Sequence, residues 1–177
     1  IIGTDKGLNY LDINTNKFLK YMLEGVERNS PYALYYLGFE YKYGGVTKIN
    51  HEHAVDYLGR SAKLGLIMSK LELIDLQSNN DFETLQKLET LMTSDEIKRT
   101  KSTHALEFVL WHASNYAVAV HNYEKGIDYA NQIINLITIR EGDEVENLAY
   151  DYLLLANAYN KSGRHLDALE AINESLR

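Results

Sequence analysis

The residues of this sequence best suited to bind a metal are two histidines separated by one residue, His51 and His53. Imidazole nitrogens are common zinc ligands, but a zinc site needs at least three protein ligands that converge on one point. Side chains two positions apart at the start of a helix point in different directions, and no third ligand with suitable spacing follows. We therefore expect a structural or surface role for this pair and no metal site.

Two other groups of titratable residues could take part in acid–base chemistry. His104, His112 and His121 fall on one predicted helix, but their spacings of 8 and 9 residues do not place them reliably on one face. The carboxylates in 143–146 could bind Ca²⁺ or act as an acid–base pair. Because the helix dipole favours negative charge at a helix N-terminus, we expect this run to mark the start of a helix.

The short motifs of the common catalytic mechanisms are absent. The sequence has no cysteine, which excludes disulfides, thiolate metal ligands and a cysteine nucleophile. It also lacks Gly-x-Ser-x-Gly, His-Glu-x-x-His and a glycine-rich phosphate-binding loop before a helix. We expect a protein that is not an enzyme and that needs no cofactor.

Composition and charge limit the classes of partner. With 45% hydrophobic residues, 24% charged residues and a formal charge of −7, the chain resembles a folded protein with an acidic surface. Because negative charge opposes phosphate binding, we expect no nucleic-acid partner. No window approaches the ~18 apolar residues of a membrane span, so none is expected. The absence of cysteine is compatible with a bacterial cytoplasm or with export, and we favour the cytoplasm.

The sequence repeats itself with two periods. Near the start, Tyr21 corresponds to Tyr57, 36 residues later, and neighbouring positions match in the same register. Near the end, Asn115 corresponds to Asn157, 42 residues later. Both lengths suit a pair of antiparallel helices with their connections. We therefore expect an all-α fold built from helical repeats.

A short motif occurs in both halves of the chain: a leucine, then a small residue, then a tyrosine three positions further on. At helical spacing these side chains share one face, where the small residue lets two helices approach closely and the tyrosine fills the gap beside it. We expect these residues, together with Ala62 and Ala168, to be buried. The motif residues are Leu37, Gly38 and Tyr41 in the first half and Leu155, Ala156 and Tyr159 in the second.

These motifs lie in segments that resemble two known repeat families. Residues 31–65 resemble a Sel1-like repeat, and 150–172 resemble a tetratricopeptide repeat of the longer, 42-residue variety. Residues 122–130 are similar to the second helix of a weaker tetratricopeptide repeat. The resemblance implies a right-handed superhelical solenoid of antiparallel helix pairs, with a concave face that binds other proteins.

We expect one solenoid domain over residues 1–177. It would comprise Sel1-like repeats over about 1–65, a degenerate helical pair over 66–101 and tetratricopeptide-like repeats over 102–177. Helix starts are expected at 80–81 and 93–96, where Asp81 or Thr93 can accept hydrogen bonds from the first free amides. The predicted helices cover 16–28, 31–43, 51–64, 67–77, 82–93, 102–121, 123–139, 144–161 and 165–177.

The start of the chain has a second interpretation. Residues 2–12 also resemble a propeller-blade strand of periplasmic sensor kinases, although the 36-residue register accounts for them with fewer assumptions. The chain begins with Ile1 and ends inside a predicted helix, so we expect it to be part of a longer protein.

In the families that the chain resembles, the first helix of each pair supplies the concave binding surface. An asparagine can donate to and accept from a peptide main chain, and aromatic side chains dominate protein interfaces. Tyr35 and Trp111 could instead pack against neighbouring helices. Leu153 occupies a position where binding of a chaperone's C-terminal carboxylate would require a lysine, which argues against that ligand. The expected partner-binding residues are Tyr32, Tyr35, Phe39, Lys42, Trp111, Asn115, Leu153, Asn157, Asn160 and Lys161.

The expected function is therefore that of a protein–protein interaction module or scaffold that binds a peptide or a partner protein on its concave face. One alternative is a sensory or regulatory segment of a larger signalling protein, such as a sensor kinase or a transcription regulator. A second alternative is an enzyme with an unconventional site. No residue pattern identifies the partner.

Overall fold

The computed structural model describes residues 5–99, 103–141 and 148–176, and these residues form ten helices and no strand. The predicted all-α fold is confirmed for this part of the chain. No helix within it combines the length and the apolar character needed to cross a membrane. The carboxylate run predicted to start a helix at 143–146 lies outside the described residues.

The chain divides into two compact units, one ending at Gln77 and one beginning at Ser78. Each unit has its own buried side chains and is described by itself. The single domain over 1–177 stays a prediction.

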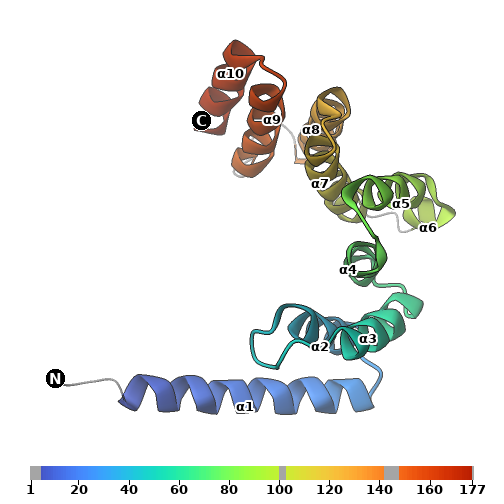
Figure 1. Ribbon diagram of the computed structural model, residues 1–177, viewed down its shortest axis with the longest axis vertical. Coiled ribbons are helices and arrows are strands. Elements are labelled where there is room, and N and C mark those ends of the chain that lie inside the picture. Colours follow the sequence, from blue (N-terminus) through green and yellow to red (C-terminus); the bar gives the residue numbers. More distant parts are fainter. Residues whose placement is uncertain (1–4, 100–102, 142–147, 177) are drawn as a thin grey trace. The chain divides into compact units, whose positions relative to one another are not determined.

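Four helices form the first unit, and successive helices pack against each other (Figure 1). Local sequence sets the ends of the second helix: the Ser30 hydroxyl accepts a hydrogen bond from the Ala33 amide, and Pro31 occupies the first turn with its φ already fixed. This helix ends at Tyr43, and Gly44 follows it with a left-handed φ of 78°. The helices are α1 (Asp5–Glu27), α2 (Pro31–Tyr43), α3 (His51–Lys63) and α4 (Ile67–Gln77).

Close packing of α2 on α3 forms the core of the first unit. Leu34, Leu37 and Leu58 are essentially inaccessible to solvent. Gly38 makes the close approach possible, since a β-carbon at this position would lie 2.7 Å from Leu58 Cγ. The predicted role of Gly38 as a small residue at a helix contact is confirmed.

The second unit contains six helices. Along the chain, α7 packs against both α5 and α8, α8 against α9, and α9 against α10. The last two helices, drawn in orange to red in Figure 1, line a groove described below. The helices are α5 (Asp81–Thr93), α6 (Asp95–Arg99), α7 (Thr103–Ala119), α8 (Tyr123–Glu141), α9 (Ala149–Lys161) and α10 (His165–Ser175).

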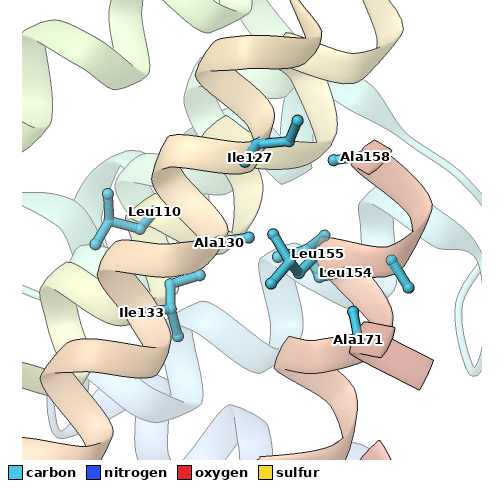
Figure 2. Packing of buried hydrophobic residues seen from close by; sticks show 9 residues of the cluster. Leu110, Ile127, Ala130, Ile133, Leu154, Leu155, Ala158 and Ala171 are labelled. Carbon is cyan, nitrogen blue, oxygen red and sulfur yellow. The ribbon is translucent and has the colours of Figure 1, made fainter. Parts of the chain in front are cut away.

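A cluster of buried aliphatic side chains holds α8 and α9 together. In Figure 2, Ile127, Ala130 and Ile133 of α8 face Leu154 and Leu155 of α9. Spacings of three and four residues put each set on one face of its helix. This core fixes the position of α9, whose opposite face is exposed.

The helix prediction is largely confirmed, and α2, α3, α4, α8 and α10 begin at the predicted residue. Three details were predicted wrongly. The first helix begins at Asp5 rather than at residue 16, so a propeller strand over 5–12 is ruled out. The side chain that caps α5 is Asn80 rather than Asp81, with its Oδ1 2.9 Å from the Glu83 amide nitrogen. The short helix α6 begins at Asp95, within the helix start predicted over 93–96, but the hydroxyl that accepts from the Ile97 amide nitrogen at 3.4 Å is that of Ser94 rather than Thr93.

The burial prediction is confirmed except at its two tyrosines. Tyr41 and Tyr159 are only half-buried. The Tyr41 ring stacks on Tyr57 with centroids 5.7 Å apart, and the Arg164 guanidinium lies 4.5 Å from the centre of the Tyr159 ring. Each phenol therefore packs through one face and keeps an edge in solvent. The buried residues are Leu37, Gly38, Ala62, Leu155, Ala156 and Ala168.

Candidate functional site

An open groove of about 470 Å³ lies between α9 and α10. Its small residues Ala156 and Ala168 are both 5% exposed, whereas Leu153 and Leu169 are 47% and 57% exposed. The groove therefore has a narrow buried floor between apolar side chains that face solvent. Its lining residues are Leu153, Ala156, Asn157, Asn160, His165, Ala168, Leu169 and Ile172.

The same groove carries polar groups. Asn157 is exposed and, within the described part of the chain, its amide has no hydrogen-bond partner. Asn160 Oδ1 lies 3.0 Å from His165 Nδ1, so these two side chains orient each other. Three predicted site residues, Leu153, Asn157 and Asn160, are therefore brought together in one groove.

A second groove, of about 460 Å³, lies over one face of α7 and is completed by α8 and the first turn of α9. Trp111 is the one predicted site residue in it, and its ring lies edge-on to His112 with centroids 5.2 Å apart. Phe108 approaches the same imidazole, with centroids 5.0 Å apart. The lining residues are His104, Glu107, Phe108, Trp111, His112, Ile133, Ile137, Tyr150 and Asp151.

Two carboxylates of the second groove influence each other electrostatically. Burial raises the pKa of Asp151, and the negative charge of Glu107 raises it further. A hydrogen bond from its own backbone amide has the opposite, weaker effect. The Asp151 carboxylate is thus held in the first turn of α9 at an energetic cost.

No three histidine, aspartate or glutamate side chains converge as a metal site among the residues that the structure describes. His53 packs its ring edge-on against Tyr41, with centroids 4.9 Å apart. His121, in the turn between α7 and α8, has a left-handed backbone, and its Nδ1 lies 2.7 Å from the Tyr123 hydroxyl.

Lys42, a predicted partner-binding residue, is buried inside the first unit with only 6% of its side chain exposed. Its ammonium nitrogen lies 2.7 Å from Glu72 Oε2 and 2.5 Å from Asp75 Oδ2. Burial by itself lowers the pKa of Lys42, but the hydrogen bonds to Asp75 and Glu72 outweigh it and raise the pKa. The lysine is therefore part of a packed ionic cluster.

The predicted aromatic residues of α2 are divided between interior and surface. Tyr35 is 6% exposed and packs in the core with Ala54, whereas Tyr32 is 60% exposed. Burial, followed by the charge of Glu72, raises the pKa of Tyr35 to about 12. Phe39 is half-buried, with its ring centroid 5.9 Å from that of Tyr35. Tyr35 therefore packs inside the unit, which is one of the two roles that the sequence allowed for this residue.

Two other predicted positions differ from their expected surroundings. The Asn115 amide donates to the Trp111 carbonyl of its own helix at 2.9 Å, so Asn115 and Asn157 have different environments although they occupy equivalent repeat positions. Lys161 is exposed but lies outside the α9–α10 groove.

Most of the second groove was not predicted from the sequence. The three histidines of 104–121 were not expected to share one face, and His121 does not line this groove. His104 and His112 line the same groove. The missed signal was the set of intermediate positions: the α7 residues of the groove follow one another at spacings of three, one, three and one, which describe a single broad helix face.

Comparisons with known proteins add no identification. No family model, curated protein or solved structure matches the chain.

Proposed function

We propose that this chain is a protein-interaction module whose second unit binds an amphipathic helical segment of a partner protein in the groove between α9 and α10. The observation that carries the proposal is the combination of exposed leucines and buried alanines in that groove. Leu153 and Leu169 present apolar surface, and Ala156 and Ala168 leave space for close approach.

The shape of the groove favours a helix as the occupant. Two neighbouring helices with small residues between them accept a third helix by packing its ridge of side chains into their groove. The apolar side chains of an amphipathic segment, spaced three and four residues apart, would contact Leu153, Leu169 and Ile172. Each leucine removed from solvent contributes to the binding free energy in proportion to the apolar area covered.

Asn157 would fix the orientation of the bound partner helix in the groove. Its side-chain amide can both donate and accept hydrogen bonds, which suits a polar side chain or an end of a partner helix. Apolar contacts alone accept many different partner sequences. A side chain beside them that forms hydrogen bonds in defined directions therefore adds specificity. Tyr35 and Lys42 are left out of the proposed surface because both are buried.

We also propose that the helices form antiparallel pairs in a solenoid of Sel1-like and tetratricopeptide-like repeats. Contacts between α2 and α3 support the antiparallel arrangement: Ser61 donates to the Pro31 carbonyl, and the Asn50 amide donates to the Tyr41 carbonyl. Residue numbers in α3 thus fall as those in α2 rise. A solenoid of such pairs offers grooves between helices as binding surfaces.

Display selection with the full chain tests the proposal. A library of random segments of about 15 residues, long enough for a helix of about 22 Å, is selected for binding. We expect amphipathic segments that bind the unmodified chain and lose affinity when Leu169→Ser or Asn157→Ala is introduced. Asn173→Ala is the matched control, because Asn173 is exposed on α10 but does not line the groove. Equal affinities of all three variants would contradict the proposal.

A further inference from the structure

We propose that the groove over α7 binds a basic side chain, lysine or arginine, of the partner segment, between the carboxylates of Glu107 and Asp151 and the rings of Phe108, Trp111 and Tyr150. This inference rests on the proposed function, because it names the chemistry of the partner.

Three aromatic rings of this groove are exposed to solvent. Phe108, Trp111 and Tyr150 are 37%, 41% and 75% exposed, and all three line one groove although they come from two helices. The rings therefore keep much of their surface in solvent, while Ile133 of α8 belongs both to the core and to the lining of this groove. Aromatic faces attract a cation that comes within about 6 Å of the ring centre.

The same groove carries two acidic side chains, which favour a cation as its ligand. Glu107 and Asp151 face the same groove, and Glu107 disfavours ionisation of Asp151. The first turn of a helix normally stabilises a carboxylate, yet the pKa of Asp151 is raised. A cation between the two carboxylates would relieve their repulsion and form charge-assisted hydrogen bonds with them. An anionic ligand would add to the repulsion.

The remaining lining residues fit the rest of such a side chain. Ile133 and Ile137 of α8 provide an apolar wall for the methylene groups of lysine or arginine. His104 and His112 are the other titratable groups on the α7 face.

The two grooves adjoin along one helix. Tyr150 lines the groove over α7 and Leu153 lines the groove between α9 and α10, and the two residues are one turn apart on α9. A single partner segment can therefore place apolar side chains in one groove and a basic side chain in the other.

The test uses segments obtained by the display selection. We expect a lysine or arginine at one preferred position of these segments. Replacing that lysine by norleucine, which keeps the chain length and removes the charge, should weaken binding about tenfold, as loss of a charge-assisted hydrogen bond implies. Glu107→Gln or Asp151→Asn should weaken binding of the lysine segment similarly and leave the norleucine segment unaffected.

Two internal checks make the result specific. Trp111 is the single tryptophan of the chain, so a change in its fluorescence on binding reports directly on this groove. Asp128→Asn removes an equal charge from an exposed site on α8, where the carboxylate accepts from Gln132 at 2.8 Å, and should change neither binding nor fluorescence.

The outcomes separate the two proposals. Segments that bind with no basic preference, or that bind equally well to Glu107→Gln, Asp151→Asn and the unmodified chain, would overturn this inference and leave the proposed function standing. The norleucine comparison remains decisive if either variant fails to fold. Failure of every segment to bind would overturn the proposed function and this inference with it.

Discussion

Lys42 Nζ lies 2.7 Å from Glu72 Oε2, and this buried ion pair joins α2 to α4 in the first unit. The side chains are 6% and 10% exposed, so the charges depend on each other for solvation. The Tyr43 hydroxyl donates a further hydrogen bond to the same carboxylate oxygen at 3.1 Å. The pair is a structural feature of the fold.

Removing the charge of Lys42 should therefore destabilise the first unit strongly. We expect Lys42→Met to lower the free energy of unfolding by about 3 to 5 kcal/mol, because it leaves Glu72 buried without its cation. Lys63→Met, at an exposed position of α3, should change it by less than about 0.5 kcal/mol. Chemical denaturation followed by circular dichroism measures both. Similar stabilities of the two variants would show that the pair is not buried.

Two glycines of the first unit should respond in opposite directions to the same substitution. Gly38→Ala places a β-carbon 2.7 Å from Leu58 Cγ and 3.0 Å from the Leu58 backbone nitrogen. We expect this crowding to lower the free energy of unfolding by about 1 to 3 kcal/mol, even though alanine has the better helix propensity. A β-carbon added at Gly59 in α3 has no neighbour within 4 Å, so Gly59→Ala should raise the free energy of unfolding by about 0.5 to 1 kcal/mol. Thermal melts of both variants decide this; a gain for Gly38→Ala would exclude the close contact.

A buried serine in each unit should also be costly to remove. The Ser61 hydroxyl donates to the Pro31 carbonyl at 2.7 Å and accepts from Ser69 at 2.6 Å, while Ser114 donates to the Gly126 carbonyl at 2.8 Å. We expect Ser61→Ala and Ser114→Ala to cost about 1 to 3 kcal/mol each, because both leave a buried polar group without its partner. Ser175→Ala, at a partly exposed site, is the control for denaturation measurements.

The sequence was sufficient to predict the helices and much of the core, because Gly38, Ala156 and Ala168 follow the helical period closely and are buried as expected. It was less informative about side-chain partners. The burial of Lys42 depends on Glu72 and Asp75, which lie some 30 residues further along the chain, and no local pattern links them.

In the candidate site, too, the sequence predicts which residues share a helix face but not which residues of different helices meet. Leu153 and Asn157 are four residues apart on α9, a spacing that the sequence alone shows to share one helix face, and both line the α9–α10 groove. The groove over α7 needs Asp151 of another helix beside Glu107, and that placement follows from the packing of α9 on α8 rather than from the period of either helix.

Asp151 provides a test by pH. Because its pKa is raised in the folded state, the folded protein holds this proton more tightly than the unfolded chain does. The associated stability is fully present below the unfolded pKa and is lost as pH rises through the folded pKa. Asp151→Asn should therefore raise the melting temperature at neutral pH, and the difference should shrink in acid. Asp128→Asn should show no such pH-dependent gain, and a lower neutral melting temperature for Asp151→Asn would contradict the electrostatic account.

The most direct measurement of the central claim is a titration of the ¹⁵N-labelled chain with a selected amphipathic segment, followed by amide chemical shifts. We predict that the largest shifts fall on the groove residues Leu153, Asn157, Leu169 and Ile172, with a second group at Trp111. Shifts concentrated in α2 and α3, with the α9–α10 groove unchanged at saturation, would contradict it.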